Sequence, residues 1–295
     1  LYLRMVLDQG FYPDGVWTAP TDEALKNDIE LSMSVGFNSA RLHQKVFEER
    51  FHYWADKLGY LTWGEAGSWG VNVNSEVAAR NFLTEWKEVV IRDRNHPSIV
   101  TWTPMNEEWW PDRVQYPRFV CDLYDMTKAL DPTRPVCTVS GGVNIKSDIW
   151  STHNYEQDPK KLKDIIYNGE RWFQTPCDVQ DIPRLNVGFN RAKDNNLFDF
   201  PTYDKADMPY ILDEFGGIKW VKGQDTQTGN SQQSWGYGEP PHSLEEFYAR
   251  LEGQVDGLMS IAENVWGYCY TQLTDVEQEQ NGIYFYDRTS KFDMN

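Results

Sequence analysis

The residues best suited to chemistry in this sequence are one asparagine and two glutamates, Asn106, Glu107 and Glu108. They follow residues 98–103, a short apolar and β-branched run that has the length of a strand. A proline stands before this run and another directly after it, which disfavours a helix at this point. We therefore expect these polar groups to sit at the C-terminal end of a buried strand.

A second acidic pair, Asp213 and Glu214, repeats this arrangement more than a hundred residues later. It follows residues 209–212, another short apolar run that predicts a buried strand. Two carboxyl groups held on separate strands are what the hydrolysis of a glycosidic bond needs. In a retaining enzyme they lie ~5 Å apart, one protonated and one ionised.

The elements that must position these acids alternate between strand-like and helix-like segments. Eight strands are predicted, at 4–7, 37–42, 60–63, 98–103, 135–139, 148–152, 209–212 and 258–268. Helices are predicted between most of them, at 21–36, 47–58, 75–96, 117–130, 159–167 and from 243 onward. This alternation predicts one α/β domain over residues 1–295, a (β/α)8 barrel whose last helix is shortened or missing. The C-terminal ends of the strands in such a barrel carry the chemistry, and the fourth and seventh strands face each other across its mouth.

Composition narrows the class of partner. The net charge of −17 argues against nucleic acid or an anionic membrane surface, and no apolar run approaches the ~18 residues of a membrane span. The 13 Trp and 16 Tyr are consistent with a carbohydrate partner, although a large barrel also buries many aromatic residues. Four scattered cysteines show no metal-binding spacing, so we expect free, buried thiols. No metal and no organic cofactor is predicted.

The beginning of the chain suggests a piece of a longer protein. Leu1 opens directly on a strand-like run, with neither a methionine nor a signal peptide. We therefore expect material upstream. The compartment, cytoplasmic or periplasmic and secreted, and the oligomeric state are not predicted.

Several motifs together resemble the catalytic TIM barrel of glycoside hydrolase family 2. The two most specific are RNHPSIVTWTPMNEE at 94–108 and PYILDEFGG at 209–217. The others are GFNSARLHQ at 36–44, YWADKLGYLTWGE at 53–65 and VWGYCYTQLTDVEQEQNG at 265–282. The resemblance covers nearly the whole chain.

This resemblance implies a retaining exo-β-glycosidase whose barrel normally follows a β-sandwich and an immunoglobulin-like domain. It implies that Glu107 is the general acid/base and Glu214 the nucleophile. A β-galactosidase is the leading specificity. The alternatives are a β-glucuronidase or β-mannosidase of the same family, a β-glycanase of a related family, and a barrel that binds sugar without cleaving it.

Substrate-binding roles also follow from the resemblance. Asn106 would hold the sugar 2-hydroxyl, Arg41 would orient the nucleophile and keep it ionised, and Tyr155 would donate a hydrogen bond to it. Trp266 would form the floor of the subsite for the cleaved sugar. Arg41 could instead be a structural ion-pair partner.

The residues themselves leave alternatives at both acids. Glu108 could replace Glu107, and Asp213 could replace Glu214. Because neighbouring side chains on a strand point to opposite faces, only one member of each pair is expected to face the site. We favour Glu107 and Glu214.

For four other residues at strand ends, the sequence leaves open whether they contact the substrate or only support the scaffold. These are His43, His153, Glu65 and Asp8. Tryptophans that could form platforms for the leaving group, or simply pack under loops, are Trp109, Trp110 and Trp235.

Two departures from the family pattern affect specificity. Some members carry Arg-x-Ser-His-Tyr-Pro after the second strand, where this chain reads RLHQK at 41–45, so the alignment of His43 is uncertain by a residue. Relatives that cleave glucuronides recognise the sugar carboxylate through Asn-x-Lys downstream of the nucleophile. The triplet of that type in this chain, at 144–146, lies upstream, which weakens the glucuronidase interpretation.

Overall fold

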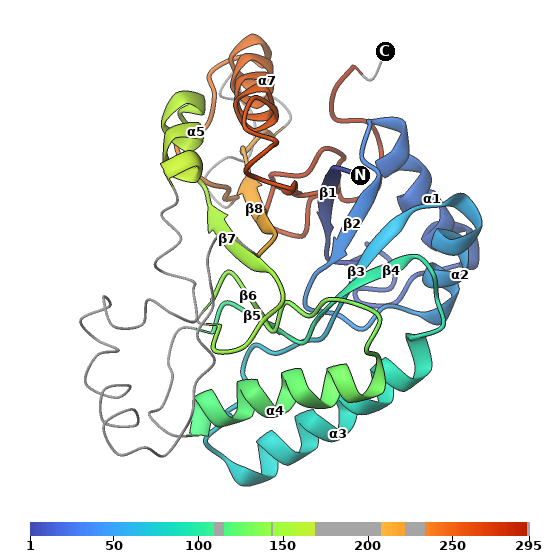
Figure 1. Ribbon diagram of the computed structural model, residues 1–295. Coiled ribbons are helices and arrows are strands. Elements are labelled where there is room, and N and C mark those ends of the chain that lie inside the picture. Colours follow the sequence, from blue (N-terminus) through green and yellow to red (C-terminus); the bar gives the residue numbers. More distant parts are fainter. Residues whose placement is uncertain (109–114, 143, 169–207, 222–233, 294–295) are drawn as a thin grey trace.

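The computed structural model places the predicted strands side by side in one parallel sheet. It describes residues 1–108, 115–142, 144–168, 208–221 and 234–293. The strands are β1 (Leu3–Asp8), β2 (Ser39–Leu42), β3 (Leu61–Glu65), β4 (Ile99–Thr103), β5 (Met105–Asn106), β6 (Val139–Ser140), β7 (Trp150–Asn154), β8 (Tyr210–Gly216) and β9 (Gly267–Thr271). Seven of them form a sheet in the order β4-β3-β2-β1-β9-β8-β7 (Figure 1).

The remaining two strands help to close the sheet into a barrel. β5 continues the course of β4 after Pro104, and it pairs in parallel with β6. Further ladder bonds join these segments, since Trp102 N–H donates to Pro135 O and Cys137 N–H donates to Trp102 O. On the other side, Asp148 N–H donates to Val136 O and so leads into β7. The chain therefore folds as a (β/α)8 barrel, as predicted, with β4 and β5 sharing one strand position.

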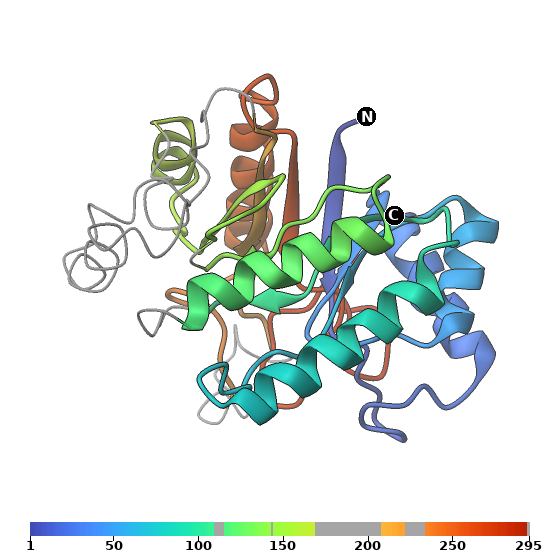
Figure 2. The ribbon, with the colours of Figure 1, turned by 60° about the horizontal axis from the view of Figure 1, so that its bottom comes forward.

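Helices cover the outside of the sheet. They are α1 (Asp22–Ser34), α2 (Glu49–Leu58), α3 (Glu76–Asp93), α4 (Gln115–Leu130), α5 (Pro159–Asn168) and α7 (Leu244–Met259). Neighbouring helices pack in pairs, α1 with α2, α3 with α4, and α5 with α7. Figures 1 and 2 show α3 and α4 running side by side along one flank of the sheet. No helix is predicted between residues 139 and 148, and the described residues of the link from β6 to β7 contain none.

Local sequence explains where these helices begin. Ser75 caps α3 by accepting a hydrogen bond from Ala78 N–H, and the stripe of Phe82, Trp86 and Val90 is buried. In α7, Ser243 accepts from Glu246 N–H while the Glu246 carboxylate accepts from His242 N–H. These reciprocal bonds satisfy backbone donors that the first turn of a helix would otherwise leave unpaired.

The interior of the barrel is filled by its own small core, separate from the layers between sheet and helices. This core contains Met5, Leu7, Trp63, Cys137, Ile149, Ile211 and Cys269. Because these side chains fill the barrel, it holds no channel, and polar groups gather at one rim. The three described cysteines, Cys121, Cys137 and Cys269, are free, as expected, and Cys121 is only partly buried.

The last predicted strand needs correction. Residues 258–268 were expected to form it, but α7 runs to Met259 and β9 begins only at Gly267. The apolar residues between them have no periodicity that separates a helix end from a strand. Within the described residues, no helix is both long and apolar enough to span a bilayer. Residues 169–207 lie outside the described residues.

Candidate active site

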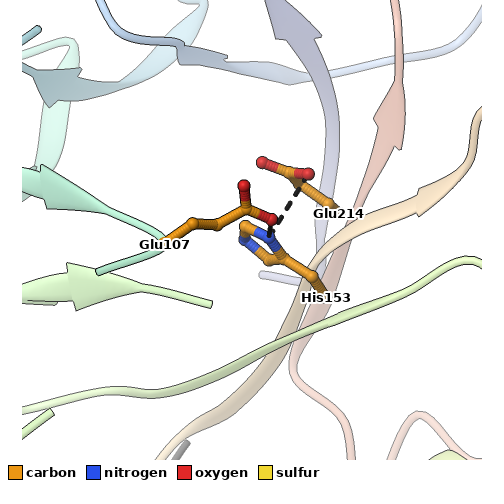
Figure 3. A group of neighbouring side chains, drawn as sticks. All are labelled: Glu107, His153 and Glu214. Carbon is orange, nitrogen blue, oxygen red and sulfur yellow. Dashed lines mark hydrogen bonds and ion pairs between the residues drawn. The ribbon is translucent and has the colours of Figure 1, made fainter. Parts of the chain in front are cut away.

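Two glutamates and a histidine meet at the C-terminal rim of the barrel. Glu107 follows β5, His153 lies near the end of β7 and Glu214 lies in β8. Each offers an oxygen or nitrogen that lies within 4.8 Å of those of the other two, and Figure 3 shows the His153 ring between the two carboxylates. Residues separated by more than a hundred positions are thus brought to one point by the closure of the barrel.

Glu214 is held in its ionised form. Its Oε1 accepts a hydrogen bond of 2.8 Å from the Arg41 guanidinium, and its Oε2 accepts one from the Tyr155 hydroxyl. Burial alone would raise the pKa of Glu214. The positive charges of His153 and Arg41, with this hydroxyl, outweigh burial and lower the pKa to about 2. An ionised, oriented carboxylate is what a nucleophile requires.

Arg41 is the fully buried centre of this arrangement. Its side chain also pairs with Glu65, at 2.8 Å from Nε to Oε2, and donates to Asn106 Oδ1. Burial acts to lower the pKa of Arg41, but Glu65 and Glu214 raise it well above its usual value. The sequence left two roles open for Arg41, and the structure shows both of these contacts. Arg41 is a structural ion-pair partner of Glu65 and also a contact of Glu214.

Glu107 is less enclosed. Its side chain is 28% exposed and its Oε1 lies 2.7 Å from His153 Nδ1. Its backbone has a φ of +50°, which is uncommon for a residue other than glycine, and its N–H donates to Ser140 O. Strained backbone of this kind clusters at functional sites. The neighbouring Glu108 has its carbonyl oxygen bonded to Tyr116, and burial raises the pKa of its carboxyl.

His153 links the two glutamates. Its Nδ1 lies 2.7 Å from Glu107 and 3.3 Å from Glu214, and its Nε2 lies 3.0 Å from Ser140 Oγ. Burial acts to lower the pKa of His153, but the negative charges of Glu214 and Asp213 and its bond to Glu107 raise it. The imidazole fits at this position only because residue 141 is glycine, since a Cβ there would lie 2.3 Å from the ring.

Asp213 differs from its prediction. Neighbours on a regular strand point to opposite faces, yet Asp213 and Glu214 are both buried and both approach His153. The register of β8 against β9 shifts between Leu212 and Phe215, and this irregularity turns both acids inward. Asp213 accepts from Ser140 Oγ, and burial raises its pKa, so it lies beside Glu214 without replacing it.

Asn106 and His43 lie at the same rim. Asn106 is fully buried, and its Nδ2 has no hydrogen-bond partner among the described residues. His43 Nδ1 lies 3.1 Å from Glu65 Oε1 and 3.2 Å from the Arg41 guanidinium. Asn106 thus keeps an amide donor available, whereas His43 supports the buried ion pair.

Trp266 lies elsewhere, and its predicted role as the floor of a sugar subsite needs correction. It directly precedes β9, where its N–H donates to Tyr210 O and its carbonyl accepts from Leu3 N–H. Leu3 and Tyr210 are the first residues of β1 and β8, so Trp266 occupies the opposite rim, 57% exposed. Because β9 begins later than predicted, Trp266 falls at the wrong end of its strand.

Several residues at the site had no predicted role. Trp69, 59% exposed, donates from Nε1 to Asn106 O and packs edge-on against His43. Tyr237 stacks on Tyr155 with ring centroids 3.4 Å apart, and Thr271 Oγ1 lies 3.1 Å from the Tyr155 hydroxyl. No short motif marks these positions, because each reaches the site through a loop or a neighbouring strand.

Asp8, a further strand-end candidate, has a structural environment. It is buried and accepts a hydrogen bond from Gly10 N–H. Burial and the negative charge of Asp28 raise its pKa to about 7. These contacts place Asp8 in the scaffold of the rim.

The other candidates contribute less. Lys146 of the 144–146 triplet reaches away from the rim to Asp125 on α4. Trp235 is 47% exposed. Trp109 and Trp110 lie outside the described residues.

The spacing of Glu107, His153 and Glu214 is also that of a metal-binding group. A metal ligand must be deprotonated at the binding nitrogen. The charges around His153 favour its protonated form, and its Nδ1 contacts both carboxylates. These three side chains therefore suit a protonated His153 better than a bound metal ion.

A parallel α/β barrel with two close carboxyl groups at its C-terminal rim is the arrangement of a glycosidase barrel. Residues 18–218 match the model of the glycosyl hydrolases family 2, TIM barrel domain. The chain therefore belongs to glycosyl hydrolase family 2.

Individual relatives agree with this family. The chain is similar to a beta-galactosidase of Pseudoalteromonas haloplanktis, 25% identical over 250 residues, which cover 81% of this chain and 23% of the relative. It is also similar to a putative beta-glucuronidase of Formosa agariphila, 28% identical over 127 residues, which cover 41% of this chain and 15% of the relative. The chain thus spans at most about a quarter of these curated relatives.

A solved structure shows the same fold. The GH2 beta-galacturonidase from Eisenbergiella tayi, bound to galacturonate, superposes with a TM-score of 0.72 at 20% identity. The match covers all of this chain and 49% of that one.

Proposed function

We propose that this barrel is the catalytic domain of a retaining exo-β-glycosidase that acts as a β-galactosidase. The observation that carries the proposal is the separation of the two acids, whose nearest oxygens lie within 4.8 Å. Retaining enzymes hold their carboxyl groups about 5–5.5 Å apart, whereas inverting enzymes leave room for a water molecule at about 6.5–9.5 Å. The distance supports direct attack on the sugar.

Glu214 attacks the anomeric carbon in the first step, while Glu107 gives its proton to the departing glycosidic oxygen. The bond from Glu214 to the sugar forms as the bond to the leaving group breaks. In the second step Glu107 removes a proton from water, which displaces Glu214 and releases the sugar with its original anomeric configuration.

The neighbouring residues fit these steps. Arg41 and Tyr155 keep Glu214 ionised and pointed at the sugar, and Asn106 Nδ2 is available to bind the sugar 2-hydroxyl. His153 donates to Glu107 and positions it. Trp69 at the rim offers an exposed aromatic face to the leaving group.

Two observations favour a galactoside over a uronide. The similarity to a beta-galactosidase extends over 81% of the chain, whereas that to a putative beta-glucuronidase covers 41%. The Asn-x-Lys triplet of this chain points to α4 through Lys146, away from the acids.

Covalent trapping tests this proposal. Incubation with 2-deoxy-2-fluoro-β-D-galactosyl fluoride should label Glu214, and peptide mass spectrometry should find the added sugar on the segment that contains β8. The variant Glu214→Gln should remain unlabelled. A panel of 4-nitrophenyl β-glycosides should show the galactoside hydrolysed fastest, ahead of the glucuronide and the mannoside.

The panel separates the alternatives as well. Faster hydrolysis of the glucuronide or the mannoside would replace the galactosidase assignment and keep the mechanism. A barrel that binds galactose yet neither takes the label nor cleaves any member of the panel would be a sugar-binding module, and the catalytic proposal would fail.

A further inference from the structure

A row of polar side chains continues from the nucleophile along one wall of the barrel mouth. Tyr155, bonded to Glu214, also contacts Thr271 Oγ1 at the end of β9. The next residue, Gln272, accepts through Oε1 a bond of 2.9 Å from the Nε2 of Gln9, which follows β1. We call these polar side chains at the ends of β9 and β1, next to Glu214 of β8, the β9–β1 wall.

Glu279 ends this row. Its Oε2 accepts a hydrogen bond of 3.0 Å from Gln9, and its Oε1 accepts one of 3.2 Å from Asn281. Asn281 is itself buried and receives a bond of 2.9 Å from Gln272. A network of polar side chains from three segments of the chain thus fixes one carboxylate, although nothing in the proposed mechanism uses it.

Glu279 faces the same space as the catalytic acids. The backbone of Glu279 pairs with that of Trp235, two residues before Tyr237, whose ring stacks on Tyr155. In agreement with this placement, the negative charges of Glu214, Glu279 and Glu107 add to burial in raising the pKa of Tyr237. The turn that carries Glu279 is fixed, because its backbone bonds in both directions with that of Val276.

Within the part of the chain that the structure describes, every buried lysine and arginine already has a partner. Lys219, which follows β8, donates from Nζ to Ser234 O, and Lys291 pairs with Asp275. Arg41 pairs with Glu65 and Glu214, and Lys45 Nζ donates to Gly10 O and lies 3.4 Å from Glu48. Burial raises the pKa of Glu279, and its hydrogen bonds from Asn281 and Gln9 act in the opposite direction. In its ionised form Glu279 would repel a sugar carboxylate beside it, and proteins use such repulsion to reject a wrong ligand.

We infer that Glu279 is the specificity-determining residue that restricts this site to neutral sugars and excludes uronic acids, by accepting hydrogen bonds from hydroxyl groups on the C4–C6 edge of the ring. The inference rests on the proposed function. With the anomeric carbon at Glu214 and the 2-hydroxyl at Asn106, across the barrel, the opposite edge of the ring turns toward the β9–β1 wall. A hydroxyl at C6 can donate to Glu279, whereas a carboxylate at C6 has no proton to give.

Two probes that differ only at C6 test this inference. They are a galacto-configured isofagomine and its C6-carboxylate analogue, with each Kd measured by calorimetry on the whole chain. The wild type should bind the neutral probe at least ~100-fold more tightly, since like charges in contact cost several factors of ten in affinity. In Glu279→Gln, the affinity for the neutral probe should fall about tenfold, because a charge-assisted hydrogen bond is removed. The affinity for the carboxylate probe should rise about tenfold, because a repulsion is removed.

The control is Glu277→Gln, the same change on an exposed residue of the same turn. It should leave both affinities within about twofold of the wild type. Because the ratio compares two probes on one preparation, partial unfolding of a variant does not change it.

The outcomes separate the inference from the proposed function. A wild type that binds both probes equally, or an unchanged ratio in Glu279→Gln, would overturn the inference alone, since binding itself supports the sugar site. A wild type that binds neither probe, and that 2-deoxy-2-fluoro-β-D-galactosyl fluoride does not label, would overturn the proposed function and the inference with it.

Discussion

Glu214 and Glu107 have different surroundings, although their nearest carboxylate oxygens lie within 4.8 Å of each other. The Glu214 side chain is 6% exposed and contacts a guanidinium, a phenol and an imidazole. The Glu107 side chain is 28% exposed and contacts the imidazole of His153. One carboxylate is fixed in position and charge by its neighbours, and the other contacts fewer groups and is more open to solvent.

This difference matches the two tasks that a retaining mechanism assigns. A nucleophile must stay ionised and aligned throughout, whereas a general acid/base must change its protonation state twice in each turnover. The contacts of Glu214 and Glu107 support the roles proposed for them, and each contact can be removed separately.

The largest expected effect comes from removing the charge of the fixed carboxylate. Glu214→Gln should lower kcat for an aryl β-galactoside by about 10⁴-fold or more, because no alternative group can attack the sugar. Steady-state kinetics measure the loss, and circular dichroism checks the fold. Glu263→Gln, an exposed glutamate, is the matched control and should retain full activity. Activity above a tenth of wild type in Glu214→Gln would remove this residue from the mechanism.

Substitution of Glu107 should cause a smaller loss of activity, and its size should depend on the substrate. Glu107→Gln should lower kcat/KM by about 10²–10⁴-fold for a poor leaving group, since general acid catalysis contributes that much. The loss should be far smaller for a dinitrophenyl leaving group, which needs no proton, and added azide should restore turnover as a glycosyl azide. Glu108→Gln serves as the neighbouring control. An equal loss with both leaving groups would contradict the acid role.

A variant at Arg41 tests how far the buried carboxylates Glu65 and Glu214 depend on a compensating positive charge. Arg41→Met should lower the free energy of unfolding by about 3–5 kcal/mol, because it leaves Glu65 and Glu214 buried without their shared cation. Urea denaturation measures the change. The control is Arg50→Met, which breaks an exposed pair with Asp22 and should alter stability little. Similar stabilities for the two variants would show that the buried pair is not structurally important.

The pH dependence of a Tyr155 variant tests whether this hydroxyl helps to keep Glu214 ionised. Tyr155→Phe removes a hydrogen bond to the ionised form of Glu214, so the depressed pKa of that carboxyl should rise from about 2 toward its ordinary 4.5. The acidic limb of the profile of kcat/KM against pH should therefore move to higher pH. At neutral pH the loss should be about tenfold or somewhat more. An acidic limb that stays in place would separate Tyr155 from the ionisation of Glu214.

The smallest effect is expected at the opposite rim. Trp266→Ala should change kcat/KM less than about twofold, because Trp266 lies at the N-terminal end of β9. Trp69→Ala, an equally drastic change at the catalytic rim, should raise KM by roughly tenfold, as loss of a tryptophan contact often does. Kinetics with one aryl galactoside compare the two variants. A larger effect at Trp266 would contradict this placement of the site.

The sequence predicted the barrel, and it brought Glu107 and Glu214 forward because each lies at the end of a short apolar run. The structure places the two acids close together, and their catalytic roles stay predictions. It misplaced Trp266, since nothing in residues 260–266 distinguishes the end of a helix from the start of a strand. It could not show that Asp213 turns inward, because a register shift depends on the neighbouring strand. Glu279 was missed for a related reason, since its partner Gln9 lies 270 positions away.

Arg41 also connects the assembly of the protein to its chemistry. Through one side chain it binds Glu65 on β3, Asn106 on β5 and Glu214 on β8, so parts of the chain up to 173 positions apart share a single cation. The pocket for this guanidinium exists only when β2, β3, β5 and β8 are all in place, because each supplies the cation or one of its partners. The proposed chemistry therefore depends on closure of the cylinder.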